Sequence, residues 1–215
     1  MIKTDNITIN TQSSVRIEGT QILYFDPYEI ENDCYDADVI FITHDHYDHF
    51  DAESIAKVKK DETVLVAPES MKNQVIRESG IEESKCRFFL PGTVHEVGKL
   101  VVETVPAYNR RKPFHPKAKH WMGYNVRMDE ITYYVSGDTD ITDEARRVKC
   151  DVAIVPIGGH FTMDAEQAAK LVVSIDPQAA IPSHYGSVVG KHEDGDKFRE
   201  AVHSENRDIL IDLKL

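Results

Sequence analysis

Cysteine is scarce in this sequence of 215 residues, and its few copies are not paired. Cys34, Cys86 and Cys150 are widely separated, and no C-x-x-C pair occurs. This spacing argues against a structural zinc ribbon and a thioredoxin-like redox motif. Scattered thiols are typical of proteins kept in a reducing compartment, so we expect a cytoplasmic protein whose cysteines stay reduced.

Long apolar runs and basic residues are also in short supply. No hydrophobic stretch approaches the roughly 20 residues that span a bilayer, and residues 1–5 lack the apolar core of a signal peptide. Lysine and arginine total 25 against 37 acidic residues, for a formal net charge of −12. This deficit argues against a general nucleic-acid binder, which needs a dominant basic face. We therefore expect neither a membrane nor a nucleic-acid partner, and the composition leaves the oligomeric state open.

Linkers, low-complexity tracts and internal repeats are absent as well, so residues 1–215 are predicted to form one domain. Short β-rich runs fill the first forty residues, and apolar strand patterns then alternate with helical ones. The predicted helices span 51–60, 68–80, 164–174 and 194–203. The predicted strands that follow the first forty residues include 64–67, 100–105, 131–136, 152–156, 179–182 and 209–213. Two β-rich blocks with accompanying helices favour two sheets packed face to face, with helices outside.

One short segment concentrates metal-binding residue types. Residues 43–49 read T-H-D-H-Y-D-H and directly follow an apolar run. Imidazole and carboxylate are ligands that Zn²⁺ and similar divalent ions prefer. Residues two apart share a face in extended structure, so His44 and His46 can converge on one ion. If the chain turns into a helix after His46, Asp48 and His49 point elsewhere and can serve a second ion.

The pattern H-x-H-x-D-H, followed by S-G-D-T at 136–139 and P-S-H-Y at 182–185, resembles the metallo-β-lactamase-fold hydrolase superfamily. Over nearly its whole length the chain is most similar to the small, single-domain hydrolases related to L-ascorbate-6-phosphate lactonase. The resemblance implies an α+β fold, a four-layered αββα sandwich with metal ions at one edge. It assigns a first ion to His44 and His46, a second to Asp48, His49 and His184, and a bridging role to Asp138.

One position departs from the family pattern. The family usually supplies a third histidine to the first ion from the loop after a strand such as 100–106, and here Asn109 stands near that position. Asparagine is a poor, neutral ligand, so the first site is expected to be weaker, to use His115 or His120 instead, or to stay empty. Fewer nitrogen ligands shift the preference from Zn²⁺ towards Mn²⁺ or Fe²⁺. The expected cofactor is therefore one or two divalent ions, with zinc, manganese and iron as candidates.

The segment 109–120 holds five basic residues and no acidic one. Its position predicts that it overhangs the metal site, where arginine can bind phosphate or carboxylate through two parallel hydrogen bonds. The alternative is a solvated loop that offsets the acidic surface. Glycines at 158–159 allow the backbone to approach the site closely, next to His160. The candidate substrate-binding residues are Asn109, Arg110, Arg111, His115, His160 and Tyr185.

These features predict metal-assisted hydrolysis of a small anionic substrate by a metal-activated hydroxide. Asp48 is expected to orient the nucleophile, and His120 or Tyr185 to stabilise the developing oxyanion. The favoured target is the C–O bond of an ester or lactone. The alternatives are phosphodiester cleavage of the nuclease or phosphodiesterase type, iron-dependent redox chemistry, and a metal-binding sensor without turnover.

Overall fold

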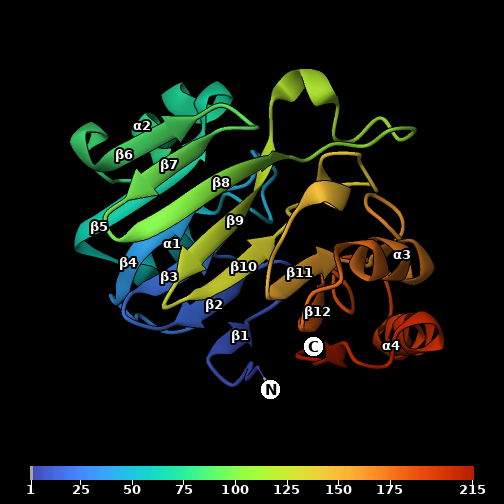
Figure 1. The fold of residues 1–215 in the computed structure, drawn as a ribbon. Helices are drawn as coiled ribbons and strands as arrows, with labels where there is room; N and C mark the ends of the chain where they lie inside the picture. Colours follow the sequence, from blue (N-terminus) through green and yellow to red (C-terminus); the bar gives the residue numbers. More distant parts are fainter. Residues whose placement is uncertain (1) are drawn as a thin grey trace.

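In the computed structural model, which describes residues 2–215, two β-sheets pack face to face and helices cover their outer faces (Figure 1). The first sheet has the strand order β1-β2-β3-β4-β5-β6, and the second has the order β13-β12-β11-β10-β9-β8-β7. The expected α+β fold, a four-layered αββα sandwich, is confirmed. Strand β1 and the C-terminal end of the chain lie low in Figure 1, opposite the segment that rises after β8.

The N-terminal half of the chain builds the first sheet. Strands β1 to β3 are antiparallel neighbours, and β3 to β6 are parallel. Asp51 caps the first helix by accepting hydrogen bonds from the backbone N–H groups of Glu53 and Ser54. The elements are β1 (Ile7–Ile9), β2 (Val15–Glu18), β3 (Ile22–Phe25), β4 (Ala37–Phe41), α1 (Ala52–Val58), β5 (Lys59–Pro68), η1 (Glu69–Met71), α2 (Lys72–Glu78), η2 (Glu83–Lys85) and β6 (Cys86–Phe89).

The second sheet repeats this plan with the antiparallel strands first. Strands β7 to β10 are antiparallel, and β10 to β13 are parallel. Asp164 and Gln167 form the expected capping box at the start of α3. The elements are β7 (Val94–Val97), β8 (Leu100–Pro106), η3 (Lys117–Lys119), β9 (Met122–Met128), β10 (Ile131–Val135), η4 (Ala145–Arg147), β11 (Val152–Pro156), α3 (Ala165–Ile175), β12 (Ala179–Ser183), α4 (Glu193–Glu205) and β13 (Leu210–Ile211).

Three apolar clusters separate the four layers. The cluster between the sheets contains Phe25 and Phe41, whose rings stack with centroids 4.7 Å apart. A second cluster joins the first sheet to α1 and α2, and a third joins the second sheet to α3 and α4. Strand β4 contributes to two of them, because Phe41 faces the other sheet while Ile40 faces the helices. This two-sided burial explains its continuous apolar sequence.

The structure differs from the expected elements at three places. The helix expected over 51–60 ends at Val58, because Lys59 adopts an extended backbone and begins β5. Lys60 then pairs with Asp38 on the neighbouring strand, with 2.6 Å between Nζ and Oδ1. Strand β6 had no counterpart among the expected elements, and the last strand covers two residues rather than 209–213. Tertiary pairing overrides the weak local signals at these places.

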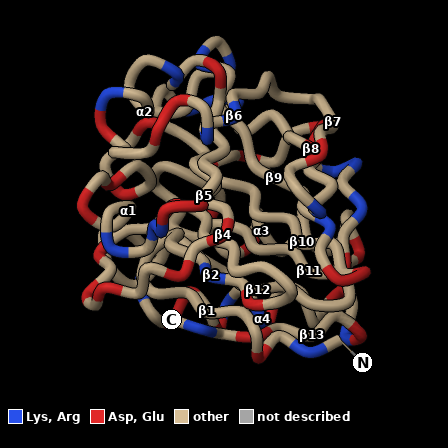
Figure 2. Tube along the Cα trace, turned by 90° about the vertical axis from the view of Figure 1, so that its left-hand side faces the viewer, with Lys and Arg blue, Asp and Glu red and all other residues tan. Residues whose placement is uncertain are grey.

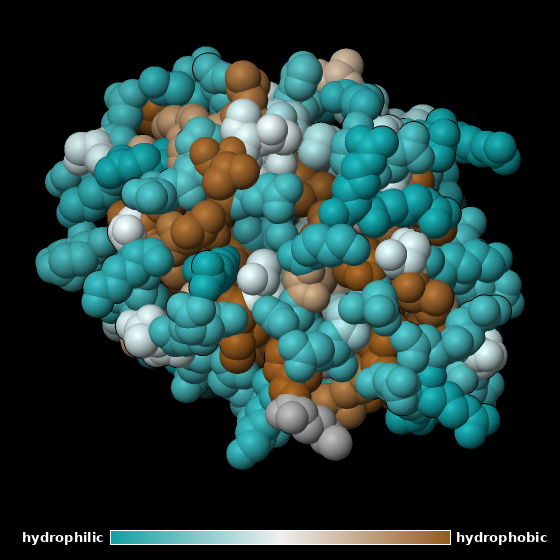
Figure 3. Space-filling view, viewed as in Figure 1, coloured by the Kyte–Doolittle hydropathy of each residue, from teal (hydrophilic) through white to brown (hydrophobic). Residues whose placement is uncertain are grey.

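The surface carries mixed charge and scattered apolar side chains. On the face that Figure 2 turns to the viewer, acidic and basic residues are interspersed around the helices and strand ends. Brown surface on the left of Figure 3 lies where β6 to β8 run, and this region includes the exposed residues Leu90, Val94 and Val101. Among residues 2–215, none of the helices has the length and apolar character needed to cross a membrane.

Candidate metal site

The residues expected to bind metal follow strands whose carboxyl ends meet at one edge of the sandwich. Residues 44–49 follow β4 in the first sheet, whereas Asp138 follows β10 and His184 follows β12 in the second. The loops at the carboxyl ends of parallel strands are the usual place for ligand-binding side chains. This topology brings residues far apart in the sequence to one place.

A tight turn shapes the histidine-rich segment. The backbone N–H groups of His49 and Phe50 donate to the carbonyl oxygen of His46, at 3.0 and 2.9 Å. His44 and His46 converge as expected, with 3.0 Å between His44 Nε2 and His46 Nδ1. Gly137 lets the other sheet approach this segment, since it has a φ of 61° and a Cβ there would lie 2.9 Å from the Cβ of Thr43.

His115 completes a first ligand group with His44 and His46, and donor atoms of all three lie within 4.8 Å of one another. Asn109 is buried beside it and does not take its place. The amide oxygen of Asn109 accepts hydrogen bonds from the backbone N–H and the ring Nδ1 of His115, at 3.1 and 2.9 Å. Because a carbonyl oxygen can only accept, Nδ1 carries the proton and Nε2 is left to face the site. Of the expected alternatives, the structure thus favours His115.

A second ligand group consists of Asp48, His49 and His184. Oδ2 of Asp48 lies 3.7 Å from Nε2 of His49 and 3.4 Å from Nε2 of His184. Asp138 lies between the two groups. Its Oδ1 is 3.5 Å from His49 Nε2, while its Oδ2 is 3.1 Å from His184 Nε2 and 3.3 Å from His115 Nε2. The carboxylate of Asp138 is thus close to ligands of both groups, and its bridging role stays a prediction.

Sequence reasoning missed Asp26, which orients ligands of both groups. Its fully buried carboxylate accepts from His49 Nδ1 at 2.7 Å and from the hydroxyl of Thr43 at 2.6 Å. The hydroxyl oxygen of Thr43 in turn lies 2.9 Å from Nδ1 of His44. Carboxylates that fix the tautomer of metal-binding histidines are common in metal sites. An oxygen of Asp26 also lies within 4.8 Å of ring nitrogens of His44 and His49, close enough for all three to share an ion. Its hydrogen bonds to His49 and Thr43 nevertheless indicate that Asp26 orients the ligands rather than binding metal itself. An aspartate ending an apolar strand was the available signal.

Opposing charges set the ionisation of this cluster in the absence of metal. Burial lowers the pKa of His49, but the charges of Asp138 and Asp26 outweigh burial and hold it well above its usual value. Burial likewise opposes protonation of His184, yet Asp138 and Asp48 raise its pKa to about 9. Burial and the charge of His49 keep the pKa of His44 well below its usual value. The metal-free site therefore holds protons on His49 and His184, while His44 is neutral.

The donor set fits divalent cations. Buried His49 Nε2, His115 Nε2 and Asp138 Oδ1 make no hydrogen bond within residues 2–215, although all face the same space. Buried polar atoms are rarely left without a partner, so three at one place indicate a missing ligand. A mixture of imidazole nitrogens and carboxylate oxygens is the set that Zn²⁺, Mn²⁺ and Fe²⁺ share. Each ligand group supplies donors for one ion.

The single tryptophan of the chain is a second residue that sequence reasoning missed. Trp121 is buried, and its ring centroid lies 5.0 Å from those of both His44 and His46. It forms an aromatic wall beside the first ligand group. Its position makes tryptophan fluorescence a direct reporter of metal binding at that group.

Three expected site residues lie outside the cluster. His120 is exposed and ends η3 with a left-handed backbone. His160 is exposed as well and packs on Phe161, with ring centroids 4.6 Å apart. Tyr185 is buried, and its hydroxyl donates to the carbonyl oxygen of Leu215 at 3.4 Å. The hydroxyl of Tyr185 is thus engaged away from the cluster, and stabilisation of an oxyanion by His120 stays a prediction. Gly158, rather than His160, packs on the site, because a Cβ there would lie 2.4 Å from the carbonyl oxygen of His184.

The bases of the cationic segment differ in how closely they pair with neighbouring groups. Lys112 donates to the carbonyl oxygen of Gly159 at 2.9 Å, and Lys117 pairs with Glu144 at 2.9 Å. Lys119 lies 3.5 Å from Asp45. Arg110 and Arg111 instead line an open hollow of about 560 Å³, whose other lining residues are Lys112, Asp140, Ile141 and Gln167.

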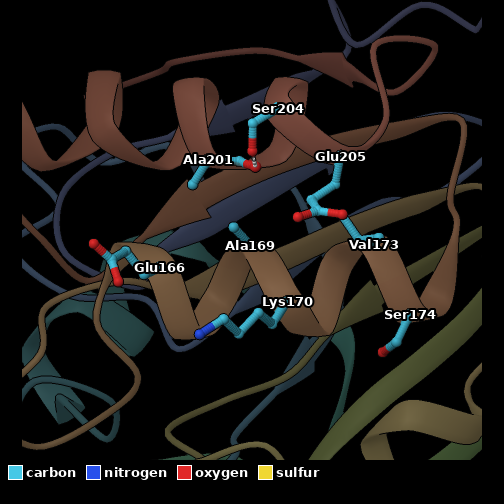
Figure 4. A pocket seen from close by; sticks show the side chains of 8 residues that line it. All are labelled: Glu166, Ala169, Lys170, Val173, Ser174, Ala201, Ser204 and Glu205. Carbon is cyan, nitrogen blue, oxygen red and sulfur yellow. Dashed lines mark hydrogen bonds between the residues drawn. The ribbon is translucent and has the colours of Figure 1, made fainter.

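A second hollow, of about 530 Å³, lies between α3 and α4 (Figure 4). Its walls carry aliphatic groups with Glu166, Lys170 and Glu205, and Figure 4 shows Glu205 directed towards α3. None of the lining residues belongs to either ligand group. The side chains that can bind metal therefore lie outside this hollow.

The contact between Asn109 and His115 leads to a testable prediction. We expect Asn109→Ala to weaken binding of the ion at His44, His46 and His115 by about 10–100-fold, the usual cost of removing a group that orients a metal ligand. Metal titrations followed by Trp121 fluorescence and chelator competition would measure this loss. Asn125→Ala is the matched control, because Asn125 is also buried but its amide bonds Glu103 and Lys149. Unchanged affinity in Asn109→Ala would contradict the role of Asn109.

Comparisons with known proteins agree with this site. Residues 5–185 match the family model described as "Beta-lactamase superfamily domain". A UPF0173 metal-dependent hydrolase from Methanopyrus kandleri is 30% identical over 92% of this chain and 90% of its own. The crystal structure of a putative metal-dependent hydrolase from Parabacteroides distasonis is 26% identical with a TM-score of 0.79, covering 97% of this chain and 92% of that chain. A putative zinc-dependent hydrolase of the metallo-β-lactamase superfamily from Thermotoga maritima shares the fold, at 16% identity and a TM-score of 0.63 over 96% of this chain and 97% of that one. The chain therefore belongs to the β-lactamase superfamily domain family, as a metal-dependent hydrolase with the metallo-β-lactamase fold.

Proposed function

We propose that this hydrolase cleaves the C–O bond of an ester or lactone in a small anionic substrate. The observation that carries the proposal is the chain of contacts that links the hollow lined by Arg110 and Arg111 to the first ligand group. The hollow that they line includes Asp140, whose Oδ1 accepts from the amide of Asn109 at 3.1 Å. Asn109 in turn contacts His115. An anionic group held by the arginines would thus be linked to His115 of the first ligand group through two residues, Asp140 and Asn109.

Two divalent ions, Zn²⁺ or Mn²⁺ with Fe²⁺ as a further candidate, are the proposed cofactors. Their ligands would be the first and second ligand groups, with Asp138 between them. The chemistry that such ions supply is a lowering of the pKa of water from about 15.7 to about 7 and polarisation of the electrophilic oxygen. Asp48 would orient the attacking water through its buried carboxylate. Arg110 and Arg111 would hold the anionic end of the substrate through charge-assisted hydrogen bonds.

Features outside the site are compatible with this proposal. The charges on the face shown in Figure 2 are interspersed, which suits a small substrate better than a nucleic acid. Cys34, Cys86 and Cys150 are free thiols, which suits a reducing compartment such as the cytoplasm.

A substrate screen tests the proposal. Protein loaded with Zn²⁺ or with Mn²⁺ would be assayed against phosphorylated and carboxylated lactones, and against bis-p-nitrophenyl phosphate. We expect turnover of anionic lactones with either ion. Turnover of the phosphodiester alone would favour a phosphodiesterase instead. Stoichiometric metal binding without turnover of any compound would favour a sensor.

The arginines provide a more specific prediction. We expect Arg110→Ala combined with Arg111→Ala to raise KM for an anionic substrate by about 10–100-fold with little change in kcat, because charge-assisted hydrogen bonds contribute about 1.5–3 kcal/mol. Steady-state kinetics would be compared with Arg127→Ala, whose side chain pairs with Glu130 on the β9–β10 turn. An equal rise in KM for a neutral ester would show that charge recognition is not the cause.

A further inference from the structure

Gln12 is an unusual residue for the turn between β1 and β2. Its side chain is fully buried, and its backbone has a left-handed φ of 51°. Polar side chains at hairpin turns usually face water, and a non-glycine residue with positive φ persists only when its surroundings hold it there. Three hydrogen bonds supply such surroundings, and all three involve the second ligand group or the loop that carries it.

The side chain of Gln12 spans the two sheets. Nε2 donates to Oδ2 of Asp48 at 3.3 Å, on the loop that follows β4. Oε1 accepts from the hydroxyl of Ser187 at 2.8 Å, on the loop that follows β12. An ionised carboxylate can only accept, so the donor end of the amide must face Asp48 and the acceptor end is left for Ser187. The Asp48 oxygen that receives this bond is the one that faces His49 and His184.

The backbone of Gln12 contacts His184, another member of the second ligand group. Its carbonyl oxygen accepts from the backbone N–H of His184 at 2.7 Å. His184 also has a left-handed backbone, with a φ of 58°. A metal ligand in such a conformation needs an external contact to keep its imidazole directed into the site. Gln12 provides that contact while its side chain bonds Asp48.

We propose that Gln12 is a positioning residue that locks Asp48 and His184 into the arrangement required by the second metal ion. Gln12 positions only the second ligand group, since Asn109 and Thr43 form the hydrogen bonds that orient the first. Loss of the Gln12 amide should therefore lower the affinity for the second ion and leave the affinity for the first ion unchanged. The proposal concerns metal binding, so it stands or falls independently of the substrate that the enzyme cleaves.

The test compares three variants with the wild type. Gln12→Met keeps the side-chain volume and the backbone carbonyl but removes the amide. Ser187→Ala removes the contact that orients the amide, at an exposed position where the fold tolerates change. Asn10→Ala is the matched control, because Asn10 lies in the same turn but bonds the carbonyl oxygens of Tyr28 and Glu29. Each protein would be stripped of metal, checked by circular dichroism and titrated with Zn²⁺ against a chromophoric chelator.

We expect Gln12→Met to bind the second ion about 10–100-fold more weakly, with the first ion and its Trp121 fluorescence response unchanged. Ser187→Ala should show a smaller loss at the same ion, and Asn10→Ala should bind both ions as the wild type does. Wild-type affinity for both ions in Gln12→Met would overturn the proposal, as would an equal loss in Asn10→Ala. If Gln12→Met does not fold, unchanged affinity in Ser187→Ala overturns it.

Discussion

Asp138→Asn is expected to lower hydrolysis by more than about a hundredfold, because loss of a group that merely orients a ligand already costs about 10–100-fold. The buried carboxylate of Asp138 approaches His49, His115 and His184 together. An amide removes the charge and one acceptor oxygen from both ligand groups at once. Metal content per folded chain, measured by elemental analysis, should fall together with turnover.

Asp143→Asn is the control for this substitution. Asp143 belongs to the same loop after β10, but its side chain is 71% exposed and lies 4.0 Å from Arg110. It should retain both ions and nearly full activity. Circular dichroism would correct both variants for the folded fraction, because removing one partner of a buried charge pair also destabilises a protein by about 3–5 kcal/mol. Full metal content and full turnover in Asp138→Asn would refute its bridging role.

Metal affinity is expected to rise steeply with pH, by about tenfold per pH unit for each proton released. The pKa of His184 is raised from 6.5 to about 9 in the metal-free protein, and that of His49 is raised as well. Both imidazoles must lose their protons before they can bind an ion. The gain in affinity should therefore continue from near neutrality to at least about pH 9, where His184 has released its proton.

The same groups make the stability of the metal-free protein depend on pH in the opposite direction. A histidine whose pKa is raised by folding stabilises the protein fully below its unfolded pKa of 6.5, and this contribution is lost as the pH rises through about 9. Asp48, with its pKa lowered to about 2, stabilises the fold above about pH 4 and loses this effect in acid. Thermal unfolding in chelator should show a falling Tm between pH 6.5 and 9. A Tm that rises over this interval would contradict the assignment.

The sequence was most informative where residues of one site are close together in the chain. His44, His46, Asp48 and His49 are consecutive enough that local geometry alone brings them together. Strand β4 was equally clear, because burial on both faces leaves an unbroken apolar run. Asp138 and His184 required the family resemblance, since an isolated aspartate or histidine after a strand has many ordinary roles.

Sequence reasoning failed where tertiary contacts decide the outcome. Whether Asn109 or His115 is the third ligand of the first group depends on how the loop between them folds. Hydrogen bonds between the two residues direct the ring of His115 towards the site. Asp26 and Gln12 gave weak signals because polar residues at strand ends and turns are usually solvated. The end of α1 was misplaced because the sequence from Lys59 to Glu62 is charged, while pairing with β4 makes its start a strand.

The ligands come from four separate segments, and the last of them, His184, follows a strand in the middle of the parallel part of the second sheet. A chain still being synthesised carries the histidine-rich segment early but has no second ligand group until β12 has left the ribosome and paired with β11. Capture of the second ion must therefore follow the pairing of β12 with β11. The first ligand group needs nothing beyond His115, so the two ions become bindable at different stages of chain growth.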